Sequence, residues 1–357
     1  MFGPTEKNNS NMFKQLATVL LVSFTFYAHA QLIVGVPNSK MINGKPIDDQ
    51  TMRSLKATET IFFYGQKDSA AFAKHGEVIK KYWKVNKLTF APLSDFSKYP
   101  VSSGKYSYFF PEMKTMIKTM SSGTPYVAAV WTFLDLKVPT QKEYESVSRL
   151  MIGPDIEDLI YLYQNYLDEP ELRIDWASWG KIKPTDHTNK LYDESAFYLH
   201  NEAQFSNFYP GLFMLYLKEI SDKLINEETQ GVLAKPEDEL GIAALADKTL
   251  IIPEGILTEY KKFRDEFVPR DREDFFKDYP YKYEVKTYEE INEMLLTEFY
   301  DDDKYILVPA IINTDQYMNI YSTKGEWIYK DMDPFTKDYS SKDLKKIAKA
   351  IAKAAKG

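Results

Sequence analysis

The sequence predicts an α/β protein with two related halves, which a helical segment separates. The first observation is that 357 residues, with 44% apolar and 27% charged, can form more than one folded domain. The second is that short apolar runs bounded by turn residues alternate with stretches of helical periodicity. The third is a repeated order of elements, because residues 57–63 are similar to 246–252, and residues 105–111 to 304–309. These similarities indicate that each half has the order βαβαββ followed by a helix.

The first half, residues 57–140, is expected to contain four strands and one principal helix. The helix begins at Asp68 or Ser69, since either side chain can accept a hydrogen bond from the first free N–H groups. Residues 113–120 have apolar side chains at helical spacing but fit an extension of the third strand equally well, so both alternatives stand. The strands are expected at 60–64, 87–93, 106–110 and 126–134.

The second half, residues 246–357, follows the same plan. Thr287 and Glu290 have the spacing of a capping box, which predicts the start of a helix. A charged region ending at Phe275 and Phe276 is also expected to be helical. The strands are expected at 249–253, 281–285 and 304–312, followed by a hairpin of 317–321 with 326–330.

Between the halves, residues 141–245 are expected to be mainly helical. Asp155 can cap the start of one helix, which ends before Pro170. A longer helix is expected to begin near Pro210, and Pro236 is expected to open a short one.

The N-terminus has the pattern of a secretory signal peptide. Lys14 precedes an apolar run at 16–27, and an Ala-His-Ala motif that a signal peptidase can recognise ends at Ala30. About a dozen apolar residues are too few to span a bilayer as a helix. We therefore expect cleavage to remove residues 1–30 and leave a short N-terminal segment at 31–56. This places the protein in a bacterial periplasm or outside the cell.

The order of the predicted elements resembles that of thioredoxin-like domains, which have a late hairpin and a closing helix. The resemblance implies that a redox motif would follow the first strand of each half. Residues 65–68 read Gly-Gln-Lys-Asp and residues 254–257 read Glu-Gly-Ile-Leu, so neither stretch has a cysteine. Residues 124–126 read Thr-Pro-Tyr, which is similar to the proline that precedes a strand in that fold. The resemblance thus implies the fold without its redox chemistry.

A second resemblance concerns the composition of the chain and the motif at the end of the predicted signal peptide. Residues 28–31 read Ala-His-Ala-Gln, and the chain is rich in Lys and in Tyr, of which it has 26. In these features it resembles uncharacterised exported proteins of the Bacteroidota type. That resemblance implies export and brings no activity with it.

Composition and motifs speak against several classes of function. The net charge of −7 is opposite to the basic surface that binds nucleic acid. The absence of cysteine excludes disulfides, thiol nucleophiles and Cys-ligated metal centres. After cleavage the remaining histidines are His75, His187 and His200, and no two have the spacing of a helical zinc site. With no phosphate-binding glycine loop and no G-x-S-x-G motif, the sequence does not indicate an enzyme, and we expect no metal, no cofactor and no catalytic residue.

One group of aromatic residues is a candidate binding surface. Tyr166, Trp176 and Trp179 can present ring faces to a sugar, and Asp175 can accept hydrogen bonds from its hydroxyls. Two carboxylates in this region would also suit glycosidase chemistry, although no pairing is visible in the sequence. Aromatic residues at helical spacing are equally typical of a hydrophobic core, so core packing is the alternative.

Residues 341–356 are expected to form an amphipathic helix. Leu344, Ile347 and Ile351 fall on one face and lysines on the other. This helix either closes the second half by packing on its sheet or makes a weak contact with a membrane surface. We expect the first, because the apolar face is mostly alanine and has no aromatic residue.

These observations predict an exported, non-enzymatic binding or scaffolding protein of the cell envelope. Its expected partner is an envelope protein or a glycan, with no nucleic acid and no transmembrane span in the mature chain. The first alternative is a glycan-binding or glycan-processing protein. The second is a cysteine-free thioredoxin-like chaperone that binds peptides at strand edges.

Overall fold

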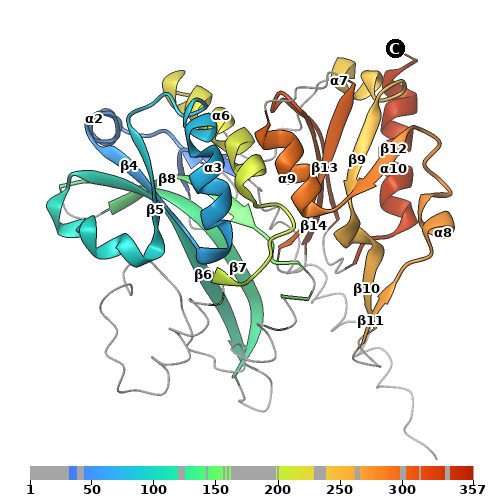
Figure 1. Ribbon diagram of the computed structural model, residues 1–357, viewed down its shortest axis with the longest axis horizontal. Coiled ribbons are helices and arrows are strands. Elements are labelled where there is room, and N and C mark those ends of the chain that lie inside the picture. The colour runs from blue at the N-terminus through green and yellow to red at the C-terminus, as the bar shows by residue number, and fades with distance from the viewer. Residues whose placement is uncertain are drawn as a thin grey trace, which may run out of the picture.

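A computed structural model shows mixed α/β architecture with two separate sheets, as the sequence predicts (Figure 1). The predicted signal peptide lies outside the residues that the structure describes. Within the described ranges no helix is long and apolar enough to cross a membrane. The described residues are 32–37, 44–119, 125–141, 144–155, 157–158, 161, 198, 201–228, 239–261, 266–297, 303–312, 315–333 and 338–356.

The first sheet has six strands in the order β1-β8-β7-β6-β4-β5. Strand β4 lies between β5 and β6 and is parallel to both, whereas the remaining neighbours are antiparallel. A separate two-stranded ladder joins β2 (Val36–Pro37) to β3 (Gly44–Lys45). The six strands are β1 (Leu32–Val34), β4 (Glu59–Tyr64), β5 (Leu88–Pro92), β6 (Tyr106–Thr119), β7 (Pro125–Pro139) and β8 (Tyr144–Ile152).

The second sheet has five strands in the order β12-β9-β13-β14-β15. Strand β9 lies between β12 and β13 and is parallel to both, and β14 and β15 continue the sheet in antiparallel fashion. A hairpin of β10 (Thr258–Lys261) and β11 (Glu266–Pro269) follows β9. The five strands are β9 (Thr249–Pro253), β12 (Tyr283–Lys286), β13 (Lys304–Ile312), β14 (Asp315–Ser322) and β15 (Trp327–Asp333).

The two sheets share one topology. Strands β5, β4, β6, β7 and β8 have the same order and the same directions as β12, β9, β13, β14 and β15. Strand β1 is an addition at the edge of the first sheet. This agreement supports the internal repeat that the sequence predicts.

The helices repeat in the same order. In the structure the first half runs from β1 to α6 and the second from α7 to α10, so the segment expected between the halves is divided between them. Helices α2, α3 and α6 of the first half correspond in chain order to α7, α8 and α10 of the second. The second half has a further helix, α9 (Tyr288–Leu296), where the first has the short 3₁₀ turns η2 (Leu93–Lys98) and η3 (Val101–Ser103). The helices are α2 (Asp49–Ala57), α3 (Ser69–Lys80), α6 (Pro210–Ile225), α7 (Glu239–Ala244), α8 (Arg272–Phe276) and α10 (Ser341–Ala354).

The residue alignment of the repeat differs by one position from the one that the sequence suggests. Residues 57–63 and 246–252 align Phe62 with Ile251, but these side chains lie on opposite faces of the repeat. Phe62 packs against Phe72 of α3, the helix that follows β4. In the second half it is Ile252, and not Ile251, that packs in the cluster with α8, the helix that follows β9. A shift of one residue moves a side chain to the other face of a sheet. The structure therefore matches Phe62 with Ile252.

Several elements differ from the sequence predictions. Strand β8 lies in the segment expected to be mainly helical. It was not predicted because its buried polar residues interrupt the apolar pattern of a strand. Part of the region expected to be helical before Phe276 is the hairpin β10–β11, with only the five residues of α8 in helix. Residues 113–119 extend β6, which settles the alternative left open there. The helix near Pro210, the capping box at Thr287 and the late hairpin are confirmed.

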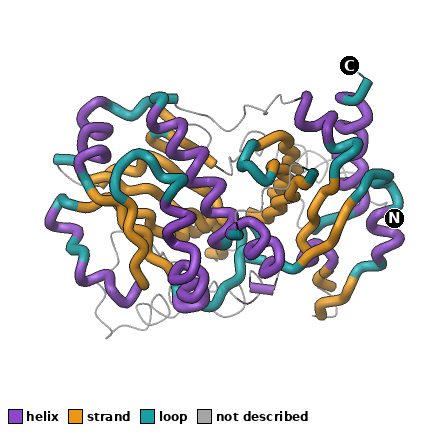
Figure 2. The backbone as a smooth tube through the Cα atoms, turned by 45° about the horizontal axis from the view of Figure 1, so that its top comes forward, coloured by secondary structure: helices purple, strands orange, loops and turns teal. Residues whose placement is uncertain are grey.

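Helix α6 joins the two halves through a shared core. Phe213 of α6 stacks on Phe62 of the first sheet with ring centroids 4.4 Å apart, and the same cluster contains Ile251 and Ile306 of the second sheet. Helix α9 packs closely on α6, since a Cβ atom at Gly211 would lie 2.8 Å from Cβ of Leu295. Helices α6 and α9 lie between the two sheets (Figure 1), and Figure 2 shows helices between and outside the two groups of strands. The halves are thus packed as one body.

Helix α10 packs against the outer side of the second sheet (Figure 1). Leu344, Ile347 and Ile351 are buried in a cluster with Ile252 and Leu307, while most of the lysines of the helix are exposed. Ser340 and Asp343 form a capping box at its start. This arrangement matches the closing-helix interpretation and leaves the apolar face covered.

Candidate functional site

The carboxyl ends of the parallel strands β9 and β13 in the second sheet and the end of β8 in the first meet at the boundary between the halves. In open α/β sheets this edge is where ligands bind. Here it holds a small cavity, which we call the interdomain cavity, with a volume of about 20 Å³. It is lined by Pro154, Asp155, Ser206, Gly255, Thr258, Tyr288, Ile311, Asp338 and Tyr339.

The first half reaches the interdomain cavity through the end of β8. The side chain of Asn207 fixes this end, because its Oδ1 accepts from Gly153 N at 2.7 Å and its Nδ2 donates to Met151 O at 2.8 Å. Gly153 lies against the second sheet, where a Cβ atom would be 2.8 Å from the carbonyl oxygen of Ile311. Only a glycine allows this approach without movement of the backbone. The next residues, Pro154 and Asp155, therefore face the second half.

Asp155 begins a helical turn, as its sequence position predicts. Its Oδ1 accepts hydrogen bonds from the backbone N–H groups of Glu157 and Asp158, each at 3.1 Å. Burial raises the pKa of the Asp155 carboxyl to about 7, and the adjacent Asp158 carboxyl adds to the effect. Asp158 is itself held by the hydroxyl of Tyr198 and by Gln204 N, which donates to its Oδ2 at 2.7 Å. Near neutral pH, Asp155 is therefore a carboxyl group poised between its two protonation states.

The second half contributes two tyrosines. Tyr288 is the first residue of α9, and burial together with the charge of Asp155 raises the pKa of its phenol. The ring lies over Gly255, where a Cβ atom would be 3.0 Å from Tyr288 Cζ. Tyr339 is only 8% exposed, and burial raises its pKa, with further contributions from Tyr288, Asp338 and Asp155 among others. Within the described part of the chain, neither hydroxyl has a hydrogen-bond partner.

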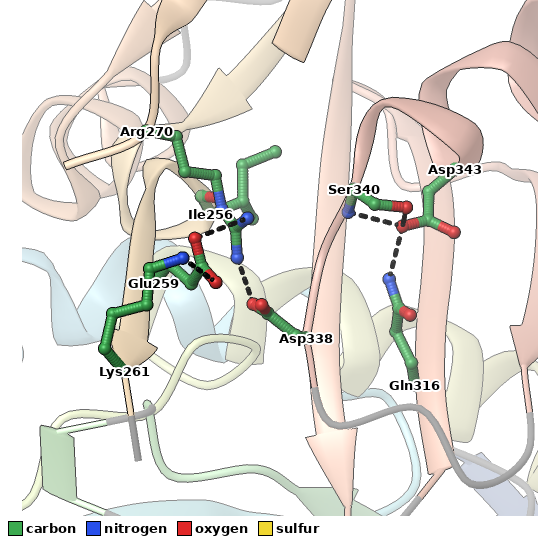
Figure 3. Close-up of polar contacts among 8 residues, drawn as sticks. All are labelled: Ile256, Glu259, Lys261, Arg270, Gln316, Asp338, Ser340 and Asp343. Carbon is green, nitrogen blue, oxygen red and sulfur yellow. Dashed lines mark hydrogen bonds and ion pairs between the residues drawn. The ribbon is translucent and has the colours of Figure 1, made fainter. Parts of the chain in front are cut away.

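Arg270 links Ile256 to Asp338, which lines the interdomain cavity (Figure 3). Arg270 donates from Nε to the carbonyl oxygen of Ile256 at 3.2 Å and pairs with Asp338 through its guanidinium. A second carboxylate, that of Glu259, lies 3.7 Å from Arg270 Nη1. Burial raises the pKa of Asp338, and Arg270 opposes that rise. The charge of Asp338 is thus compensated inside the second half.

A second cavity of about 30 Å³ lies at the carboxyl end of β4, and we call it the β4 cavity. Lys67 is held there by a hydrogen bond from its ammonium group to the carbonyl oxygen of Ala203, and its Nζ lies 4.9 Å from the ring centroid of Phe205. Burial lowers the pKa of Lys67 and raises that of Asp68. The lining residues are Phe62, Phe63, Tyr64, Gly65, Lys67, Asp68, Leu134, Ile152, Phe205 and Phe208.

The site residues predicted from the sequence, Tyr166, Asp175, Trp176 and Trp179, lie outside the described residues, as do His187 and His200. His75 is buried, and its Nε2 lies 3.5 Å from an Oε of Glu293. Within the described ranges, no group of three or more acidic or imidazole side chains is arranged to hold a metal ion.

Two stretches that sequence analysis noted only for their lack of cysteine line cavities in the structure. Residues 65–68 line the β4 cavity through Gly65, Lys67 and Asp68, and residues 254–257 line the interdomain cavity through Gly255. Tyr288 and Tyr339 were missed by sequence analysis. The signal available for Tyr288 was its place next to the Thr287 capping box, after the end of a predicted parallel strand.

Searches for relatives find no family model, no curated protein and no solved structure that matches this chain. The thioredoxin-like and Bacteroidota-type resemblances therefore stay predictions. The site has to be interpreted from its own geometry.

Proposed function

We propose that this chain is an exported, non-enzymatic binding or scaffolding protein of the cell envelope, and that its partner contacts the interdomain cavity. The observation that carries the proposal is the convergence of polar groups from both halves on one cavity at the carboxyl edges of the two sheets. Asp155 and Ser206 come from one side of the boundary, and Tyr288 and Tyr339 from the other.

The packing of the halves supports a binding role. The shared core around Phe213 holds the two walls of the cavity in one arrangement before any partner arrives. A preformed site costs less ordering entropy on binding than one that must be assembled. Of the two charged residues that line the cavity, Asp338 is already paired with Arg270, which also donates to the carbonyl oxygen of Ile256.

The two alternatives predicted from the sequence remain proposals of their own. A glycan-binding protein would use Tyr166, Trp176 and Trp179, and loss of sugar binding in Trp176→Ala and Trp179→Ala variants that still fold would favour it. A peptide-binding chaperone would bind extended peptides at free strand edges, such as those of β5 and β12.

The proposal is tested by affinity capture of the tagged protein from its native envelope, with cross-linking and mass spectrometry. We expect a stoichiometric protein partner whose cross-links surround the interdomain cavity. Thr258→Arg, which puts a long charged side chain at this cavity, is expected to lower recovery of the partner at least tenfold. Thr297→Arg makes the same change at an exposed position and should leave recovery unchanged.

Two results would contradict the proposal. One is turnover of a substrate by the purified protein in an unbiased hydrolase screen. The other is recovery of the protein alone, with no partner above background, which would direct attention to a glycan array.

A further inference from the structure

We infer that the interdomain cavity binds a primary ammonium group, presented by a lysine side chain of the protein partner. This inference rests on the proposed function and specifies the chemistry of its contact. Three properties of the cavity carry it: its size, its hydrogen-bond acceptors and its charge.

The size of the interdomain cavity selects a small head group. A volume of about 20 Å³ suits a single water-sized group. A sugar ring or an aromatic ring is much larger, whereas a primary ammonium group is close to water in size. Asp155, Gly255, Thr258 and Asp338 are each partly exposed, so the cavity has an entrance from solvent. A lysine side chain can therefore bring its ammonium group in from outside.

The free acceptors match the donors of an ammonium group. An ammonium carries three N–H donors and no acceptor. Tyr339 lines the cavity and is only 8% exposed, and its hydroxyl has no hydrogen-bond partner within the described ranges. The hydroxyl of Tyr288 is in the same situation. Ser206 donates its own proton to the carbonyl oxygen of Gly153 at 3.2 Å, which leaves lone pairs on its Oγ.

The charge around the cavity also favours a cation. Arg270 compensates Asp338, but among the described residues no ion pair within 4 Å involves Asp155. The charge of Lys67 interacts with that of Asp155, but its ammonium group donates its hydrogen bond to the carbonyl oxygen of Ala203. The charge of Asp155 contributes to the raised pKa of both Tyr288 and Tyr339. An entering ammonium group would supply a countercharge in direct contact and form charge-assisted hydrogen bonds.

The test uses the full chain and two small probes at pH 8. Nα-acetyl-lysine N-methylamide carries the ammonium group, and Nα-acetyl-norleucine N-methylamide has the same stem without it. We expect the lysine probe to bind at least about tenfold more tightly in calorimetry or NMR titration, as a charged hydrogen bond of ordinary strength implies. Tyr339→Phe and Asp155→Asn are each expected to weaken the lysine probe about tenfold. Tyr283→Phe, which makes the same change at an exposed tyrosine, should have no effect.

The outcomes separate this inference from the proposed function. Equal binding of the two probes, or lysine binding that is unchanged in both Tyr339→Phe and Asp155→Asn, would overturn the ammonium site and indicate that the cavity holds water. If the wild type and Asp155→Asn then capture the same envelope partner equally, the proposed function stands without the ammonium contact. Selective lysine binding with no captured partner would instead contradict the proposed function and point to a free small amine as the ligand.

Discussion

The two halves build the same sheet but place different polar pairs at one equivalent position. In the first sheet Asp135 of β7 is opposite Arg149 of β8, and in the second sheet Asn319 of β14 is opposite Lys330 of β15. Arg149 holds Asp135 with two hydrogen bonds of 2.7 and 2.6 Å and lies 4.0 Å from the ring centroid of Phe133. The first half thus has a carboxylate opposite a guanidinium where the second has an amide opposite an ammonium group.

The surroundings lower the pKa of both Asp135 and Lys330, which favours the charged form of the carboxyl group but the neutral form of the lysine. Burial alone would raise the pKa of Asp135, but the charges of Arg149 and Lys137 outweigh it and lower the pKa to about 2. Burial lowers the pKa of Lys330 to about 8. The comparison teaches that the repeat conserves the position of a polar cross-strand pair while its charge is free to vary. The following predictions test how far the equivalence of the halves extends.

The largest effect is expected from the helix that joins the halves. Phe213→Ala removes a ring that stacks on Phe62 and lies in the shared core, so we expect a loss of about 3–5 kcal/mol in the free energy of unfolding. Because this core contains residues of both sheets, denaturation should remain a single transition. Ile347→Ala in α10, the corresponding helix, is expected to cost about 2–4 kcal/mol. Chemical denaturation with hydrogen exchange measures both, and separate unfolding of the halves in the wild type would contradict the shared core.

The second prediction compares the two polar pairs directly. Arg149→Met leaves the buried Asp135 without its main partner, so we expect a loss of about 3–5 kcal/mol at pH 7. Lys330→Met removes an ammonium group whose pKa is lowered by burial and whose Nζ lies 5.7 Å from the ring centroid of Trp327, so we expect a change of no more than about 1 kcal/mol in either direction. Urea denaturation of both variants decides the point. Equal losses at the two positions would show that the second pair is as dependent on its cation as the first.

The third prediction concerns pH and the interdomain cavity. The Asp155 carboxyl has a pKa of about 7 in the folded protein and an ordinary value of 3.8, so the folded state retains a proton that the unfolded state has released. The stabilisation is complete below pH 4 and is lost as the pH rises toward 7 and above. We expect this group to lower the free energy of unfolding by about 1–2 kcal/mol over that range, after allowance for its partial exposure.

Asp155→Asn keeps an oxygen that can cap the following turn but removes the titration. Its unfolding free energy is expected to vary less between pH 5 and 8 than that of the wild type. A pH profile of thermal unfolding measures the difference, and identical profiles would contradict the assignment. The titratable groups that act on Asp155 or respond to it are Glu157, Asp158, Lys67, Tyr198, Tyr288 and Tyr339.

The smallest effect is expected at the helix caps. Thr287→Ala removes the side chain that accepts a hydrogen bond from Glu290 N at 3.1 Å, and we expect a loss of about 1 kcal/mol. Thr287→Ser keeps the hydroxyl and should retain most of the stability. A loss above about 2 kcal/mol in the alanine variant would mean that the cap also positions Tyr288 at the interdomain cavity. Thermal denaturation of the two variants separates these cases.

Much of the fold follows from local patterns in the sequence. The apolar runs at 249–253 and 304–312 have the lengths of buried strands, and the structure places β9 and β13 there. The capping box at Thr287 marks the start of α9, and the helical spacing of Leu344, Ile347 and Ile351 marks the buried face of α10. Each of these signals depends on residues within about two turns of one another, which is why periodicity detects them.

Strand β8 and the candidate site could not be found in this way. In β8, Ser148 and Arg149 are buried, so the strand has no simple alternation of apolar and polar residues. The buried charge of Arg149 is compensated by Asp135 on β7, whose carboxylate accepts its hydrogen bonds. The interdomain cavity joins Asp155 to Tyr288 and Tyr339, which are far apart in the sequence and share no motif.

The α/β class, the presence of two halves and the type of most helices and strands follow from the sequence alone, because hydrophobic periodicity and capping act over short distances along the chain. The alignment of the repeat required three-dimensional packing, since a shift of one residue exchanges the two faces of every strand. The same packing also decided the shared core around α6 and the cavity between the halves. Both depend on contacts between residues that are distant in sequence, and their geometry is set by how whole sheets and helices pack against one another.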